Sequence, residues 1–454
     1  MNIEEVLDSV PKYKEFMTVR ELDTSSRELA DEFSGVSLRR IGESREGRPI
    51  SCLKIGEGER SALLFAFPHP NEPIGSMTVE FFSRYLAENP DMTKQTGFTW
   101  YLIKAIDPDG AALNEGWFKG EFDPVKYARN YYRPPGHEQM EWTFPVKHKN
   151  LSFNEPPSET LALMSLIDEI KPDFMFSLHN AGFCGVYFYL THKIEKSYPH
   201  LVDLVRNQNL PLHQGEPEAP YIKELSPGIY EMFGVQEMYD FYEVNGVENP
   251  QELIKWGTSS ADYLKTVTNN RGFTLLCEMP YFYDTALDDS SLTDEDRRAL
   301  VFESLEFQVE LYQFSKKKFD SIREYCNPNS KIFSSIADMA DNFEDRILPE
   351  FIHTRNSPMY EGKATVAQAF DSRISSRYYG YLRSAMITRL CDEAIAIHPE
   401  KEKELTDIKL EMDEYIESGV RNTLDSTNFE VIPIQKLVRV QVGSALNCIK
   451  YLPS

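Results

Sequence analysis

The feature that most constrains this fold is a series of strand-length apolar runs that alternate with amphipathic segments. Residues 61–68 (SALLFAFP) and 98–106 (FTWYLIKAI) are almost continuously apolar, which is typical of strands buried on both faces of an α/β sheet. Residues 18–34 and 75–88 carry apolar side chains at helical spacing. Further strand patterns occur in DFMFSLHNAG, GVYFYLTH and RGFTLLCEMPYF. Strands that alternate with helices predict an α/β fold with a mixed sheet.

The last third of the chain has a different pattern. From about residue 294, long segments carry apolar side chains at helical spacing. Residues 326–331 (CNPNSK) combine Pro, Asn and Ser and are our candidate for a boundary. We therefore predict an α/β domain over residues 1–320 and a C-terminal α-helical domain of unknown role over residues 321–454. Residues 377–383 place tyrosines near two arginines, which predicts core packing, with a homo-oligomer through the helical region as a further hypothesis.

Net charge and cysteine usage limit the partners and the compartment. The chain has 454 residues with 48 Lys and Arg against 72 Asp and Glu, a formal charge of −24. This charge opposes binding to nucleic acid and to anionic membrane surfaces, so we expect neither partner. No apolar run approaches the roughly 20 residues of a membrane span, and the first residues do not resemble a secretory signal. The six cysteines are scattered without a CxxC pair, so we expect reduced thiols in a cytoplasmic protein.

One His-x-x-Glu pattern directly follows a predicted strand. His69 and Glu72 come just after residues 61–68, and ligands of open α/β sheets bind beyond the carboxyl ends of strands. An imidazole and a carboxylate three residues apart can turn toward one zinc ion. The same spacing begins at His192 and at His213, so spacing alone does not choose among the three. The structural alternative is a strand-end His followed by a Glu that stabilises a helix N-terminus.

Two more residues with metal or acid–base chemistry end predicted strands. His179 lies in SLHNAG, where a structural His bonded to a backbone carbonyl is the alternative to a ligand. Glu278 follows the apolar run TLLC, where an unpaired carboxylate is costly. A buried Glu needs an ion pair or a metal-site role, and a raised pKa would suit a general base. Two His, one Glu ligand and one free Glu form the set with which a catalytic zinc activates water.

Six motifs in this order resemble those of the zinc carboxypeptidases of the carboxypeptidase A type. IGESREGRPISCLKIG resembles the segment before the first metal motif, HPNE the His-x-x-Glu itself, and DPDG the Asn-x-Asp-Gly turn, with Asp107 in place of the Asn. TFP…PPSETLAL over residues 143–164 resembles the stretch after the substrate-binding segment, SLHNAG the third-ligand motif and TLLCEMPYF the catalytic-Glu strand. The resemblance covers residues from about 18 to 315 and implies a mixed sheet sandwiched by helices.

The resemblance also implies roles for individual residues. It implies one zinc ion per chain with three protein ligands: His69, Glu72 and His179. Glu278 would be the general base that deprotonates the zinc-bound water and later protonates the leaving amine. The family arginine that stabilises the oxyanion should lie between DPDG and TFP, where Arg129 and Arg133 stand, and Arg129 is the preferred candidate.

The substrate-binding segment departs from the family pattern. Where the family has an Asn-Arg pair that binds the terminal carboxylate of a peptide, this sequence has Glu141 and Trp142. A carboxylate at this position would repel the substrate's terminus. Carboxylate binding would then depend on Arg129, Asn130 or Arg133.

These observations predict a zinc-dependent metallohydrolase that cleaves a C–N amide or peptide bond, with a carboxypeptidase-type peptidase as the first candidate. An amidase or deacylase is the close alternative, acting on a modified or γ-linked peptide or on a small N-acyl amino acid. A non-catalytic binding protein on the same fold is the second alternative. The presence of the three predicted zinc ligands together with Glu278 argues against it. The expected partner is a peptide or small amide substrate.

Overall fold

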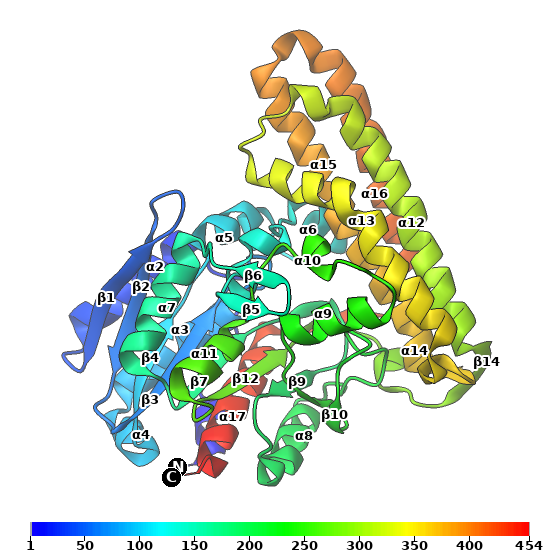
Figure 1. Cartoon of the computed structure of the whole chain (residues 1–454). Coiled ribbons are helices and arrows are strands. Elements are labelled where there is room, and N and C mark those ends of the chain that lie inside the picture. The colour runs from blue at the N-terminus through cyan, green and yellow to red at the C-terminus, as the bar shows by residue number, and fades with distance from the viewer. Residues whose placement is uncertain (1, 454) are drawn as a thin grey trace.

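A nine-stranded mixed sheet forms the centre of the first two thirds of the chain (Figure 1). The computed structural model describes residues 2–453. The central strands β4, β3, β7 and β12 run parallel to one another. They span Phe98–Ile103, Arg60–Ala66, Phe174–Leu178 and Phe273–Glu278. Beyond β4 the sheet continues with β2 (Pro49–Ile55) and β1 (Val36–Glu43). Beyond β12 it continues with β9 (Tyr187–Leu190), β11 (Ile229–Glu231) and β10 (Glu224–Ser226).

Helices cover both faces of this sheet, as the continuously apolar strands predict. Successive side chains of β3 enter opposite cores: Leu64 joins one cluster of buried residues, and Leu63 and Phe65 join the other. The first core includes residues of α2 (Val19–Glu32) and α3 (Ile74–Glu88), and the second those of α7 (Ser158–Ile170) and α11 (Ser260–Thr268). The predicted α/β fold, a mixed sheet sandwiched by helices, is confirmed.

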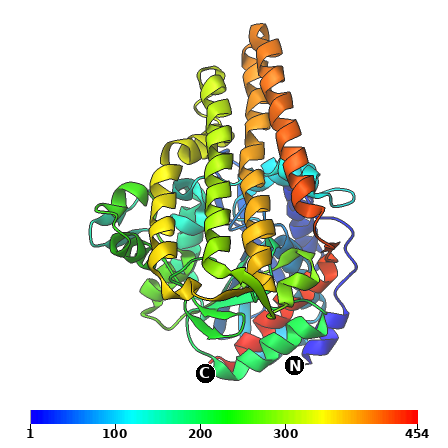
Figure 2. The ribbon, with the colours of Figure 1, turned by 90° about the vertical axis from the view of Figure 1, so that its right-hand side faces the viewer.

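Four long helices make up most of the helical part of the chain: α12 (Arg297–Ile322), α13 (Lys331–Asn356), α15 (Ser376–Ile397) and α16 (Glu402–Leu424). Among them, α12, α15 and α16 project beyond the body of the molecule (Figure 2). The side chain of Asp296 caps α12 and that of Ser330 caps α13, which satisfies backbone amides that have no partner within the helix. Tyr378 and Tyr381 are buried, in agreement with core packing. Self-association through this region stays a prediction.

The α/β part and the helical part of the chain are connected more closely than a division between residues 320 and 321 implies. Residue 320 lies inside α12, a helix that is continuous from Arg297. The last helix, α17 (Ile434–Tyr451), leaves the helical region and packs against α3, α8 (Tyr198–Asn207), β7 and β12, beside the N-terminus (Figure 1). Its apolar periodicity resembles that of the other helices, so the sequence alone does not reveal which surface it covers.

Two further expectations concern the environment of the chain. Among residues 2–453, no helix combines the length and the apolar character needed to cross a bilayer. All six cysteines are buried and free, as expected for reduced thiols.

Candidate metal and catalytic site

A sharp turn after β3 brings the first His-x-x-Glu pattern to the carboxyl edge of the sheet. Phe67 has a φ of 57°, an uncommon conformation for a bulky residue that the surrounding packing has to hold, and its side chain is fully buried. His69 and Glu72 follow, and α3 begins at Ile74. The Ile74 amide donates to Asn180 Oδ1 at 3.1 Å, which ties this turn to the end of β7.

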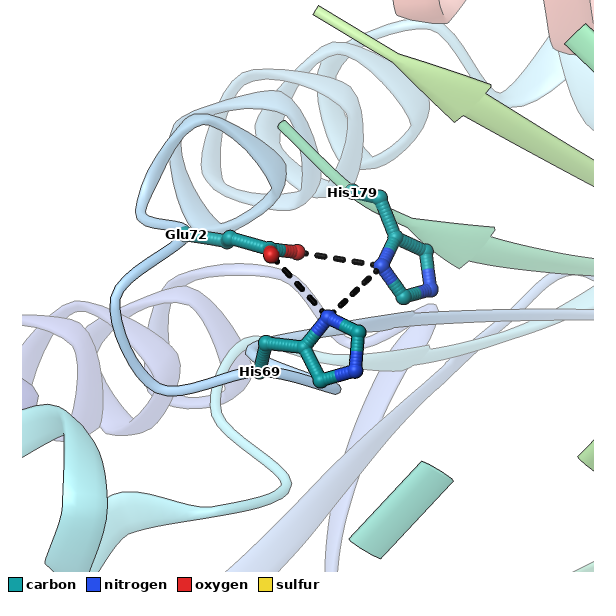
Figure 3. Close-up of side chains that lie close together, drawn as sticks. All are labelled: His69, Glu72 and His179. Atoms are coloured by element: carbon teal, nitrogen blue, oxygen red, sulfur yellow. Dashed lines mark hydrogen bonds and ion pairs between the residues drawn. The ribbon is translucent and has the colours of Figure 1, made fainter. Parts of the chain in front are cut away.

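His69, Glu72 and His179 converge at this edge (Figure 3). His69 Nδ1 lies 2.9 Å from Glu72 Oε1, and His179 Nδ1 lies 3.0 Å from Glu72 Oε2. The two Nδ1 atoms are 3.2 Å apart, and all three side chains are buried. Over residues 2–453, this is the one group of three His, Cys, Asp or Glu side chains whose donor atoms lie within 4.8 Å of one another. The structure therefore brings together the three predicted ligands.

The donor set fits zinc. Two imidazole nitrogens and one carboxylate are common ligands of catalytic zinc, and ligands at about 2.0–2.1 Å from a tetrahedral ion lie about 3.3 Å apart. The donor atoms here are separated by 2.9, 3.0 and 3.2 Å. Burial lowers the pKa of His69 to about 3, so its imidazole is neutral near pH 7. The two histidines hold the pKa of Glu72 below its usual range despite its burial.

Glu278 ends β12 beside these three residues. Its Oε1 lies 3.8 Å from His179 Nδ1, and its Oε2 is buried with no hydrogen-bond partner among the described residues. Burial raises the pKa of Glu278 well above its usual range, and the negative charges of Glu72 and Glu218 raise it further. Glu278 also lines a cavity of about 50 Å³ with His69 and His179. A buried carboxyl group with a raised pKa, next to a metal site, has the properties of a general base.

Arg133, and not Arg129, is the arginine at this site. Arg133 Nη1 donates to Glu72 Oε1 at 3.1 Å. Arg129 instead pairs with Asp413 at 3.3 Å and Glu417 at 2.6 Å on α16, and 42% of its side chain is exposed. The preference for Arg129 is therefore wrong. The physical reason is that α6 (Pro124–Asn130) turns its last residues toward α16, and the chain becomes extended only at residue 131.

The remaining predicted substrate residues have other surroundings. Asn130 does not reach the site, since its side chain donates to the Lys126 carbonyl within α6. Trp142 lines the small cavity near Phe233, with 6.0 Å between ring centroids. Asp107 caps α5 (Pro108–Asn114) by accepting from the Gly110 amide at 2.9 Å.

The carboxylate of Glu141 accepts hydrogen bonds from neighbouring protein groups. Its main interactions are therefore with the protein, and not the expected repulsion of a substrate carboxylate. It accepts from the Ser260 amide at 3.1 Å and from the Ser260 and Ser177 hydroxyls at 2.7 and 3.1 Å. Ser177 Oγ in turn lies 2.8 Å from His179 Nε2. Glu141 and Ser177 therefore support the ring nitrogen of His179 that points away from Glu72, as groups behind metal ligands commonly do.

Three residues near the site were missed from the sequence. Ser177 lies on β7, and His179 comes directly after the end of that strand, so the two-residue alternation of an extended chain could have identified Ser177. Glu218 accepts from the Tyr189 hydroxyl at 3.0 Å and lines the cavity from a loop that has no recognisable pattern. Gln441 of α17 donates to the His179 carbonyl at 3.0 Å, a contact across 262 residues that no local pattern reveals.

The two competing His-x-x-Glu patterns lie elsewhere. His192 is exposed beyond the end of β9. His213 Nε2 lies 2.7 Å from the Glu216 backbone oxygen, so it interacts with the main chain of its own motif. Tertiary position thus separates His69 from two patterns of identical spacing.

A mixed α/β sheet therefore carries a buried His-Glu-His group that could hold a metal ion at its carboxyl edge, with a buried Glu beside it. The family model described as zinc carboxypeptidase matches residues 23–274, more than half of the chain. The chain belongs to the zinc carboxypeptidase family.

Individual relatives are distant. An uncharacterized protein of Zymomonas mobilis is 25% identical over 165 residues, which cover 34% of this chain and 38% of that protein. A metallo-carboxypeptidase from Burkholderia cenocepacia has a TM-score of 0.36 and 17% identity, covering 58% of this chain and 60% of that one. Carboxypeptidase A from Helicoverpa armigera has a TM-score of 0.39 and 12% identity, covering 62% and 71%. The chain thus spans less than two thirds of the length of the first two proteins.

Proposed function

We propose that this chain is a zinc-dependent metallohydrolase that cleaves a C–N amide or peptide bond, with a carboxypeptidase-type peptidase as the first candidate. The observation that carries this proposal is the buried convergence of His69, Glu72 and His179 beside the unpaired carboxyl oxygen of Glu278. Membership of the zinc carboxypeptidase family supports zinc as the metal. Six buried free cysteines support a reducing compartment, and we propose the cytoplasm.

The chain's own residues account for the proton transfers and the charge stabilisation. When bound, zinc supplies Lewis-acid chemistry that polarises a carbonyl group and acidifies water. Glu278 Oε2 accepts a proton from the attacking water and later donates it to the leaving amine. The Arg133 guanidinium stabilises the negative charge that develops on the scissile carbonyl oxygen. Glu141 and Ser177 fix the orientation of His179.

An amidase or deacylase is the second candidate, and the surroundings of Glu141 favour it. This residue stands where the family's carboxylate-binding pair is expected, and its oxygens are engaged by Ser177 and Ser260. The test is product analysis of the zinc-loaded protein against a mixed library of peptides, γ-linked peptides and N-acyl amino acids. Release of C-terminal amino acids from ordinary peptides supports the peptidase, and cleavage of only the other two classes supports the amidase. If the protein cleaves no C–N bond in any member of the library, the result contradicts the proposed function.

The first prediction concerns the metal. Zinc reconstitution of the full chain is expected to give about one zinc per chain, and His179→Ala is expected to weaken zinc binding by at least about 100-fold because one of three protein ligands is lost. His192→Ala removes an exposed His from a pattern of the same spacing and should keep the zinc. Competition with a chromophoric chelator measures both affinities. Equal zinc affinity in the two variants would contradict the assignment of His179.

The second prediction separates the two arginines. Arg133→Gln is expected to lower kcat by about 10²–10³-fold, because it removes the cation that faces the developing oxyanion. Arg129→Gln makes the same chemical change on an exposed residue paired with α16, and should change kcat less than twofold. Steady-state hydrolysis of the substrate found in the library tests both variants. A larger loss in Arg129→Gln than in Arg133→Gln would restore the preference based on sequence.

A further inference from the structure

Helix α17 buries one long polar side chain, that of Gln441, between the buried residues Val440 and Val442. A buried amide without hydrogen-bond partners is costly, and an aliphatic side chain would pack at this position without that cost. The other buried polar side chains of α17, Ser444 and Asn447, donate to carbonyls of their own helix. Gln441 instead bonds to two other elements, and these bonds distinguish its position from the rest of the helix.

The amide of Gln441 bridges the segments next to Glu72 and His179. Its Nε2 donates to the His179 carbonyl at 3.0 Å, and its Oε1 accepts from the Thr78 hydroxyl at 2.6 Å. Thr78 lies on α3, one turn after Ile74, where this helix begins two residues beyond Glu72. One side chain of the last helix therefore connects the two segments that supply these candidate metal ligands.

The His179 carbonyl lies just beyond the paired part of the sheet. Strand β7 pairs with β3 and with β12 as far as Leu178, so the bond from Gln441 holds the first carbonyl after this pairing ends. On the side of α3, a Cβ atom at Gly75 would lie 2.6 Å from Leu178 Cβ. Helix α3 thus packs directly on the end of the strand, and α3 and α17 together limit the movement of the main chain at His179.

We propose that Gln441 is a positioning residue of the metal site, which holds the main chain of His179 in register with Glu72. The proposal rests on the proposed function, since it takes these two residues as zinc ligands. Their facing donor atoms are 3.0 Å apart and come from different segments (Figure 3). Ligand distances in a metal site vary by only about 0.2 Å, so a small displacement of the main chain at His179 weakens zinc binding. Ser177 contacts the ring of His179, whereas Gln441 fixes the main chain that carries this ring.

The zinc affinity of the full chain, measured by competition with a chromophoric chelator, tests this role. Gln441→Met keeps the length of the side chain and removes both hydrogen bonds. It is expected to weaken zinc binding about 10–100-fold, the usual loss when a group behind a metal ligand is removed. Thr78→Val removes only the bond to α3 and should weaken zinc binding by a smaller factor. Asn447→Leu is the matched control, since it replaces another buried amide of α17 whose bond stays within that helix. This control should change the zinc affinity less than about twofold.

The geometry of the bound metal separates positioning from stability. Gln441→Met and Asn447→Leu should both lower the unfolding temperature of the metal-free chain, because each removes a buried hydrogen bond. Cobalt bound in place of zinc reports the ligand geometry through its visible absorption. The cobalt spectrum of Gln441→Met is expected to differ from that of the unchanged protein, and the spectrum of Asn447→Leu is expected to match it.

Zinc affinity and a cobalt spectrum that are the same in Gln441→Met and Asn447→Leu would overturn the proposal. If Gln441→Met does not fold, Thr78→Val decides the question, and an unchanged zinc affinity in this variant overturns the proposal. These measurements need no turnover, so the proposed function is judged separately. Zinc binding without any C–N cleavage would contradict the hydrolase and leave the role of Gln441 in place. If the unchanged protein binds no zinc, the metal site is wrong and both proposals fall.

Discussion

Glu278→Gln is expected to lower kcat by about 10²–10⁴-fold, the usual loss when a general base is removed. The amide has nearly the shape of the carboxyl group and cannot accept a proton from water at neutral pH. The fold should persist, since Gln fills the same volume at a site where burial already disfavours the charged carboxylate. Steady-state hydrolysis of the library substrate and circular dichroism measure the two effects.

The zinc content of Glu278→Gln shows whether its activity falls because the general base is lost or because the metal is lost. Glu278 Oε1 is 3.8 Å from His179 Nδ1, farther than the 3.0 Å between His179 and Glu72, so Glu278 stands outside the ligand group. We therefore expect Glu278→Gln to keep about one zinc per chain. Glu195→Gln is the matched control, since it makes the same change in an exposed residue of a competing His-x-x-Glu pattern. Unchanged kcat in Glu278→Gln would show that another group is the base.

Truncation after residue 320 is expected to prevent folding of the remaining chain. The truncated chain lacks α17, which buries seven large aliphatic side chains: Ile434, Leu437, Val438, Val440, Val442, Leu446 and Ile449. At about 1.5–3 kcal/mol for each buried side chain, their loss costs roughly 10–20 kcal/mol, as much as the whole stability of a typical domain. Thermal unfolding by circular dichroism and limited proteolysis measure the outcome. A cooperative transition in the truncated chain would establish residues 1–320 as an independent domain.

Point variants on α17 provide the matched test within the full chain. Val438 is fully buried, and Val438→Asp places an unpaired carboxylate in the core, which should cost several kcal/mol of the free energy of unfolding. Lys436→Asp introduces the same residue two positions earlier, on a partly exposed part of the helix, and should cost less than about 1 kcal/mol. Similar unfolding temperatures for the two variants would contradict the packing of α17 against the sheet.

Many elements of the fold could be predicted because their signals are local. The helix expected over residues 18–34 is α2, Val19–Glu32, and the strand expected over residues 61–68 is β3, Arg60–Ala66. Apolar periodicity and capping act within a few residues, so a sequence window contains them. The destination of α17 could not be predicted in this way, because a helix with one apolar face can cover any apolar surface of matching shape.

The residues of the candidate site show the same difference between local signals and tertiary contacts. His69, Glu72, His179 and Glu278 each follow a strand-like run, and the order of their motifs connects them. Arg129 and Arg133 stand in one short segment, so the sequence does not distinguish them, and only the end of α6 decides which of them faces Glu72. The hydrogen bonds of Glu141 could not be predicted either, since its partners Ser177 and Ser260 lie far from it in the sequence, and only Ser177 continues to His179.

By itself, the sequence determined the alternation of strands and helices, the zinc carboxypeptidase motifs and the residue types of a hydrolytic centre, because each depends on short stretches of chain. The tertiary structure alone decided which arginine reaches the site and that Gln441 of the last helix bonds to His179. These are contacts between residues that lie up to 262 positions apart, and they exist only after the chain has packed. Periodicity and motif spacing carry no information about such contacts.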